Sequence, residues 1–254
     1  MSKITYNTMS GMELEMRRQE ILANNLAAVS VPGFKSEFLV SSPTPNSGDG
    51  NDPLCGVKSG SIKVDFEQGE VKNTGRRLDF ALQGKGFFQV SSEDGKTMYT
   101  RNGAFKVTSD FKLVTDQGFA VMNETGGEIV FLPQDDLSNL EVGADGTLKI
   151  RGDATQGYAY RTVGKLKVQQ ISNLTEMERL TGSYYRMNAG VLPKEFTDPK
   201  PEFVVSNGML EESNVSAMKT MTMLIQSSRD FEMCNKIMRM LTEMGNSERQ
   251  TFGS

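Results

Sequence analysis

The 254-residue sequence contains no histidine and no tryptophan. Without histidine the chain lacks the Ser/His and Cys/His nucleophilic pairs, most zinc sites and the usual general base near neutral pH. The absence of tryptophan removes a side chain that often anchors binding hot spots. Any catalysis would therefore depend on carboxylates, lysine, tyrosine, serine or threonine.

Cysteine and long apolar runs are also scarce. Cys55 and Cys234 are the only thiols, and two free small side chains are expected rather than a disulfide or a metal pair. The sequence contains no run of 18 apolar residues, so no transmembrane helix is predicted. The first eight residues lack the apolar core of a secretory signal peptide. A net charge of −4 and a pI near 5.2 give no electrostatic reason to expect a nucleic-acid partner.

What the chain does have is methionine at both ends: twelve of its 16 methionines fall in 1–34 and 209–244. The first of these segments predicts an amphipathic helix from Thr5 to Val29, with Leu22 widening its apolar stripe. Pro32 and Gly33 end the helix, because proline biases the preceding residue away from helix and glycine permits a sharp turn. The stripe alternates spacings of three and four residues: Met9, Met12, Met16, Gln19, Ala23 and Leu26.

The second end segment predicts a helix capped by Ser213 or Asn214 that runs to about Met244 and ends at Gly245. Its stripe follows the same alternation as the first: Met221, Leu224, Ser228, Phe231, Asn235 and Met238, widened by Met218, Ile225 and Leu241.

Isolated amphipathic helices are marginal in water, so each stripe needs a partner. The two helices could cover each other, yet each stripe is wider than a two-helix contact requires. Residual apolar surface for neighbouring subunits is therefore expected, and flexible methionine side chains suit contacts with non-identical neighbours. The alternative is that methionine fills the core of one folded monomer.

The middle of the chain alternates short apolar runs with turn dipeptides, a pattern typical of compact antiparallel β-structure. The polar segment 41–53 predicts a loop that is mobile or ordered by a neighbour. We therefore predict an α+β chain, with a coiled-coil-like terminal helical domain (1–35 and 209–254), a loop and β linker region (36–75) and a central antiparallel β domain with a return linker (76–208). The turn dipeptides are Asp94-Gly95, Asn102-Gly103, Gly126-Gly127 and Asp145-Gly146.

Motifs that could carry chemistry are weak. Asp135 and Asp136 lie beside turn signals, where aspartate usually binds its own backbone. Gly84-Lys85-Gly86 lacks the third glycine and following helix of a phosphate loop, and 46–52 lacks the spacing of a calcium loop. No cofactor, metal, small-molecule substrate or enzymatic activity is expected.

Three segments together resemble the bacterial flagellar rod and hook family. Ala23–Lys35 (ANNLAAVSVPGFK) resembles its N-terminal signature, and Leu210–Val215 (LEESNV), with Arg229, Phe231, Glu232 and Lys236 downstream, resembles its C-terminal one. Leu78–Phe88 (LDFALQGKGFF) followed by Tyr99–Phe105 (YTRNGAF) is similar to the family's core motif. The sequence departs from the usual pattern at three positions: Ala28, Val31 and Lys85.

The resemblance implies a rod subunit that is exported unfolded by the flagellar type III apparatus, without a cleaved signal peptide. It further implies a helical polymer in the periplasm-spanning rod of the basal body, with itself and other rod subunits as partners. The terminal helices would form the inner tube (domain D0) and the β domain (D1) an outer layer. The length and Arg229–Met233 resemble the proximal-rod member most.

The resemblance also assigns roles at the two ends. Met9, Met12, Met16, Leu22 and Leu26 are expected to pack against Met218, Met221, Leu224, Ile225 and Phe231, partly within and partly between subunits. Pro32, Gly33 and Phe34 would turn the chain out of the tube. Four asparagines would fix register, or else cap helices or contact solvent: Asn24, Asn25, Asn214 and Asn235.

Two rival interpretations remain open at this stage. One is a distal-rod or hook-type protein of the same architecture. The other is a monomeric β-rich surface binding protein or glycan-active enzyme whose helices close on each other.

Overall fold

The computed structural model describes residues 2–43, 57–92, 94–152, 159–188, 190–191 and 203–251. The chain divides into two compact units, each made of segments far apart in sequence. The helical unit comprises Met1–Ala27, Ser36–Asp65 and Val215–Ser254; the β unit comprises Ala28–Lys35 and Phe66–Asn214. Two long helices and antiparallel strands make the chain α+β, which confirms the predicted class.

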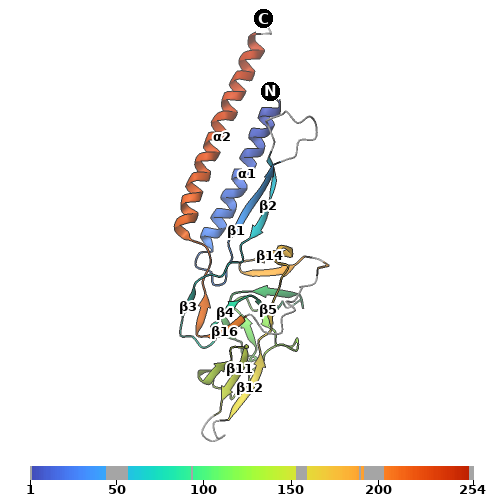
Figure 1. Ribbon diagram of the computed structural model, residues 1–254, viewed down its shortest axis with the longest axis vertical. Helices are drawn as coiled ribbons and strands as arrows, with labels where there is room; N and C mark the ends of the chain where they lie inside the picture. Colours follow the sequence, from blue (N-terminus) through green and yellow to red (C-terminus); the bar gives the residue numbers. More distant parts are fainter. Residues whose placement is uncertain are drawn as a thin grey trace. The chain divides into compact units, whose positions relative to one another are not determined.

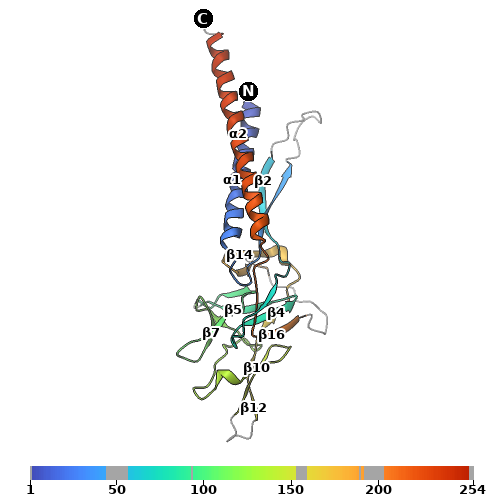
Figure 2. The ribbon, with the colours of Figure 1, turned by 90° about the vertical axis from the view of Figure 1, so that its left-hand side faces the viewer.

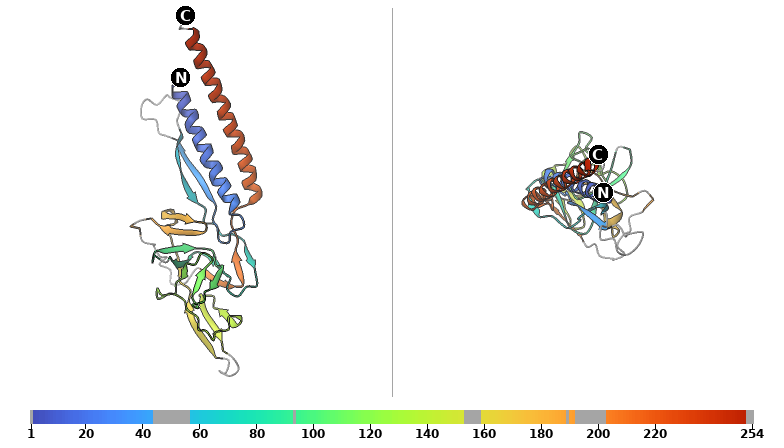
Figure 3. Two further views of the ribbon diagram at one scale, coloured as in Figure 1. Left: turned by 180° about the vertical axis from the view of Figure 1, so that it is seen from behind. Right: turned by 90° about the horizontal axis from the view of Figure 1, so that it is seen from above.

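The helical unit contains α1 (Ser2–Ala27) and α2 (Ala217–Thr251), which lie side by side and run in opposite directions (Figures 1 and 3). Neither helix contains proline, so each backbone ladder is continuous. α2 is the longer helix and extends past the first turn of α1 (Figure 2). Among helices in the described ranges, none is long and apolar enough to cross a membrane.

Both ends of α2 differ from the sequence prediction. The helix begins at Ala217 and not at a cap on Asn214, because the Asn214 backbone N–H and side chain donate to the carbonyls of Phe34 and Glu67 in the β unit. The helix also continues through Gly245 to Thr251. Glycine costs only about 1 kcal/mol in a helix interior, and no proline follows to stop the helix.

A two-stranded hairpin completes the helical unit. β1 (Glu37–Pro43) pairs antiparallel with β2 (Val57–Val64), and both strands contact α1. The end of β1 corrects the prediction that 41–53 is entirely loop, since Ser41–Pro43 are in the strand and 44–53 lie outside the described residues. An edge strand tolerates Pro43 because its missing N–H need not join a ladder.

In its described residues, the β unit holds short antiparallel strands in four sheets. The largest sheet has the order β14-β15-β6-β5-β9-β8-β7, with β13 also paired to β5; the others are β10-β11-β12, β16-β4 and β17-β3. Among the described residues, Leu137–Asn139 and Leu174–Glu176 form 3-10 turns between strands. The strands are β3 (Val71–Asn73), β4 (Phe80–Gly84), β5 (Phe87–Ser91), β6 (Thr97–Thr100), β7 (Phe105–Val107), β8 (Leu113–Thr115), β9 (Ala120–Val121), β10 (Leu140–Val142), β11 (Thr147–Arg151), β12 (Tyr160–Lys165), β13 (Val168–Gln169), β14 (Met177–Thr181), β15 (Tyr184–Met187), β16 (Phe203–Asn207) and β17 (Met209–Glu211).

One predicted hairpin turn has a different role. The glycines of three predicted turns have positive φ, at Gly95, Gly126 and Gly146. Gly103 does not, and the strands that flank it, β6 and β7, are not neighbours in the sheet. The chain instead crosses the backbone of Phe80 there, with the Phe80 N–H donating to the Gly103 carbonyl at 3.0 Å. Glycine is needed for the close approach of two backbones, not for a turn.

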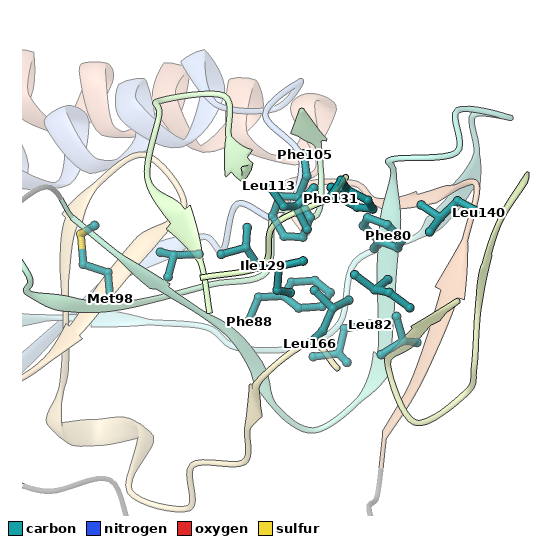
Figure 4. Packing of buried hydrophobic residues seen from close by; sticks show 14 of the residues in the cluster. Phe80, Leu82, Phe88, Met98, Phe105, Leu113, Ile129, Phe131, Leu140 and Leu166 are labelled. Atoms are coloured by element: carbon teal, nitrogen blue, oxygen red, sulfur yellow. The ribbon is translucent and has the colours of Figure 1, made fainter. Parts of the chain in front are cut away.

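The core of the β unit is built around phenylalanine (Figure 4). The Phe105 ring centroid lies 5.5 Å from that of Phe88 and 5.7 Å from that of Phe80, so β4, β5 and β7 meet through aromatic contacts. Aliphatic side chains fill the space around the rings: Leu82, Leu113, Ile129, Leu140, Leu148 and Leu166.

The crossing at Gly103 predicts a sharp sensitivity to a single methyl group. A Cβ there would lie 1.8 Å from the Phe80 carbonyl oxygen, so Gly103→Ala should lower the free energy of unfolding of the β unit by about 3 kcal/mol. Denaturant unfolding followed by tyrosine fluorescence measures this change. Gly127→Ala is the control, because its Cβ would meet only the Asn123 side chain at 3.4 Å. Equal midpoints for the two variants would contradict the prediction.

Candidate assembly interface

The contact between α1 and α2 follows two rows of side chains that we call the seam. On α2 the seam positions are four and three residues apart, and all are buried or half-buried. They are Thr220, Leu224, Ser227, Phe231, Cys234, Met238 and Leu241. The corresponding half-buried or buried positions on α1 are Thr8, Met12, Glu15, Gln19, Leu22 and Leu26.

The predicted stripe residues divide between the seam and the outside of the pair. Of the ten residues predicted to pack between the helices, five contribute to the seam: Met12, Leu22, Leu26, Leu224 and Phe231. The other five of these ten are exposed: Met9, Met16, Met218, Met221 and Ile225. The alternation of three- and four-residue spacings placed Met221 and Ser228 on the predicted stripe, whereas in the structure the buried positions are Thr220 and Ser227.

The outward side of α2 therefore carries large apolar side chains. Met218, Met221 and Ile225 form one stripe at helical spacing near the start of the helix, and Met218 is 81% exposed. Met233, Ile237 and Met240 form a second stripe further along. Neighbouring exposed apolar residues of this kind usually mark a contact surface. We call these two stripes the outer face of α2.

The four predicted asparagines have separate environments. Asn24 is exposed and Asn235 is half-buried on α2. Asn25 is buried at the end of α1, where its Nδ2 donates to the Glu37 carbonyl at 2.8 Å and its Oδ1 accepts from the Glu37 N–H at 2.9 Å. Asn25 thus pairs with the backbone as a neighbouring strand would and fixes the start of β1 against α1. Asn214 binds backbone groups in the β unit.

Within the β unit, Pro32, Gly33 and Phe34 lead into a tightly held turn. Pro32 is half-buried, whereas Gly33 has φ +66° and its N–H donates to the Glu211 carbonyl at 2.7 Å. A Cβ at Gly33 would lie 2.4 Å from the backbone of Arg101, so only glycine fits. The Phe34 ring is buried under the Arg179 guanidinium, 4.0 Å from the ring centroid.

The next residue, Lys35, belongs to a buried ion network that sequence reasoning missed. Its Nζ lies 2.6 Å from Glu211 Oε1 and donates to the Glu67 carbonyl at 2.5 Å. Arg101 Nη1 lies 3.3 Å from Glu211 Oε2, and the Gly69 N–H also donates to the carboxylate. Lys35 and Glu211 are fully buried and Arg101 is 5% exposed. Each of the three lies inside a signature segment, which is the only signal the sequence offered.

The network binds two cations with one carboxylate. Burial lowers the pKa of Arg101, and the Glu211 carboxylate opposes that shift. Backbone carbonyls also stabilise the Arg101 guanidinium, which donates to the carbonyls of Leu82 and Gly84 at 3.1 and 2.7 Å. Three segments, 33–35, 67–69 and 211–214, meet at this one site beside Arg101.

Within the described residues no group of three or more metal-ligating side chains gathers in a suitable geometry. The seam, the Asn25 hydrogen bonds and the Glu211 ion network hold segments of the chain in place through packing, hydrogen bonding and ion pairing.

Removing the shared charge should be costly. Glu211→Gln leaves Lys35 and Arg101 buried without a counter-ion, so the β unit should lose about 3–5 kcal/mol of unfolding free energy in denaturant titrations. Glu212→Gln is the matched control, because its pair with Lys72 is solvent-exposed and contributes at most about 1 kcal/mol. A loss no larger for Glu211→Gln than for this control would show that the network is not stabilising.

Loss of the Asn25 amide should release the hairpin. Asn25→Ala removes both hydrogen bonds to Glu37, and amide exchange in β1 should accelerate about tenfold or more, as expected for the loss of at least one net hydrogen bond. Hydrogen exchange with mass spectrometry measures it. Asn24→Ala, at an exposed neighbouring position, should leave β1 unchanged.

Three protein families match separate parts of the chain. The family described as "Flagella basal body rod protein" matches residues 6–35, which include the α1 side of the seam. "Flagellar hook protein FlgE/F/G D1 domain" matches 81–150, which contain most of the phenylalanine core. "Flagellar basal body rod FlgEFG protein C-terminal" matches 206–247, which contain Glu211 and most of α2.

Individual relatives match over nearly the whole length. The chain is 31% identical over 246 residues to the flagellar basal-body rod protein FlgF of Caulobacter vibrioides, covering 95% of this chain and 94% of that protein. It is 30% identical to FlgF of Escherichia coli K12, covering 93% of each chain. It is 26% identical over 272 residues to the rod protein FlgG of Borreliella burgdorferi, covering 98% and 100%.

These relatives are structural rod proteins and not enzymes, which removes the glycan-active enzyme from consideration. At this identity and coverage, the chain belongs to the flagellar basal-body rod protein family and is a structural protein of the rod.

Proposed function

We propose that α1 and α2 pair as a short antiparallel coiled coil and that neighbouring subunits cover the outer face of α2 in a helical rod polymer. The observation that carries this proposal is the direction of the apolar side chains on α2. Met218, Met221 and Ile225 are half or more exposed, whereas Thr220 and Ser227 face α1. A helix that served only its own monomer would turn its larger apolar side chains inward.

The length of α2 supports the same proposal. α1 begins at Ser2, and α2 extends past its first turn, so among the described residues of this unit no helix lies beside the last part of α2 (Figure 2). Met240, on the second outer stripe, is 56% exposed. A neighbouring copy is the occupant we propose for this surface, because an open helical polymer is built from head-to-tail contacts between unlike surfaces.

The proposed partners are other copies of this chain and other rod subunits, to whose different surfaces the flexible methionine side chains can adapt. We further propose that the chain takes a proximal position in the periplasm-spanning rod, in keeping with its similarity to FlgF proteins. Delivery by the flagellar type III export apparatus, without removal of a signal peptide, completes the proposal.

The outer face can be tested without disturbing the seam. A chain carrying Ile225→Asn and Ile237→Asn should keep its free energy of unfolding within about 0.5 kcal/mol, because both side chains are at least 40% exposed. It should nevertheless fail to enter rods, measured as loss of swimming and of the subunit from isolated basal bodies. Thr222→Asn, at an exposed polar position of the same helix, is the control.

Seam variants provide the contrast. Leu224→Asp or Phe231→Asp should abolish incorporation by separating the helices, while the β unit remains folded. Normal swimming by the double outer-face variant would refute the proposed contact, whatever the seam variants do.

A further inference from the structure

A polar cluster lies in the middle of the seam. The Ser227 side chain is 1% exposed, and its Oγ donates to Glu15 Oε2 at 2.7 Å. Gln19 Nε2 donates to the Ser227 carbonyl at 3.2 Å. The other Glu15 oxygen pairs with Arg18 Nη1 at 3.3 Å, and the Glu15 side chain is 12% exposed. Both carboxylate oxygens therefore have partners, although the group is largely removed from water.

The remainder of the seam does little to define how α1 is positioned along α2. Its apolar row on α2 has a leucine, a phenylalanine and a methionine seven residues apart: Leu224, Phe231 and Met238. If α1 slipped by seven residues along α2, the apolar seam residues of α1 would again lie opposite apolar seam residues of α2. Packing alone would then allow several related pairings of similar stability.

A slip does change the partners of Glu15. Moving α1 by seven residues toward the end of α2 places Glu15 opposite Cys234, between Phe231 and Met238. The carboxylate would lose the Ser227 hydroxyl and lie against apolar groups, which penalises a charged side chain strongly. Of these two registers, only the observed one gives the Glu15 carboxylate a hydroxyl partner.

We propose that Glu15, Gln19 and Ser227 set the register of α1 on α2 and act as positioning residues for assembly. This inference rests on the proposed function, because the register decides which side chains of α1 stand beside the outer face of α2. Polar groups within a helix seam stabilise less than apolar ones but select one arrangement over its neighbours.

Cysteine cross-linking can read the register directly. Gln19 contacts Ser227, and the two helices are antiparallel. Met12, seven residues before Gln19, therefore lies opposite Cys234, seven residues after Ser227, and both are seam positions. In a Cys55→Ser background, Met12→Cys with the native Cys234 reports the observed register. Met12→Cys with Cys234→Ser and Leu241→Cys reports a slip of seven residues. Both are measured on the dilute, purified full chain by oxidation and peptide mapping.

Ser227→Ala should lower the ratio of in-register to slipped cross-link about tenfold, as expected for losing a hydrogen bond to a charged group. Ser227→Thr, which keeps the hydroxyl, should restore the ratio to within about twofold on the same scale. Ser228→Ala, at the exposed neighbouring position, is the matched control and should leave the ratio unchanged.

Two results would overturn the proposal: an unchanged ratio in Ser227→Ala, or a reference chain that does not form the in-register cross-link. Circular dichroism of each variant shows whether the helices are present, so a change of register is separated from unfolding. The assay needs no flagellum. Normal rod incorporation of the double outer-face variant would therefore count against the proposed function and leave the register result standing.

Discussion

The Glu211 carboxylate is the group on which the β unit most depends. It is fully buried, and it binds Lys35, Arg101 and the Gly69 N–H together. Each of these groups would be expensive to bury alone, because a charge without a partner loses its hydration without compensation. Together they join segments that are up to 178 residues apart, from Gly33 to Glu211, at one point of the unit. Beside that point Gly33 lies against the Arg101 backbone, and Arg179 stacks on Phe34 and donates to the Lys35 carbonyl.

The two sides of α2 carry different kinds of side chain and have different roles in the helical unit. The inward side combines apolar side chains such as Leu224 and Phe231 with small polar ones such as Ser227, whose hydroxyl donates to Glu15. The outward side uses large, flexible methionines such as Met218 and Met233, which adhere broadly. A polymer subunit needs both properties: a fixed shape to present, and an adaptable surface with which to attach to neighbours.

The sequence predicts the elements better than their contacts. Periodicity identifies both helices, because a 3.6-residue repeat survives over 26 and 35 residues, but α2 continues past the predicted end at Met244 to Thr251. It misplaces Met221 and Ser228, since hydrophobicity cannot show that a serine is turned inward by a distant glutamate. The hairpin at Glu37 and Val64 is short and pairs through backbone groups that carry no composition signal. Lys35 and Glu211 lie 176 residues apart, and only the fold brings them together.

The discontinuity of both units has a consequence for the order in which the chain can fold. Synthesis and any transport that starts at the N-terminus deliver the first residues before the last ones. The ion pairs of Lys35 and Arg101 cannot form until their counter-ion, Glu211, has been delivered. α1 likewise cannot pair until α2, which begins at Ala217, is present. Contacts of such long sequence separation form late and close large loops. About five-sixths of the chain must therefore have emerged before either unit can be completed, so the subunit stays incompletely folded until its last helix arrives.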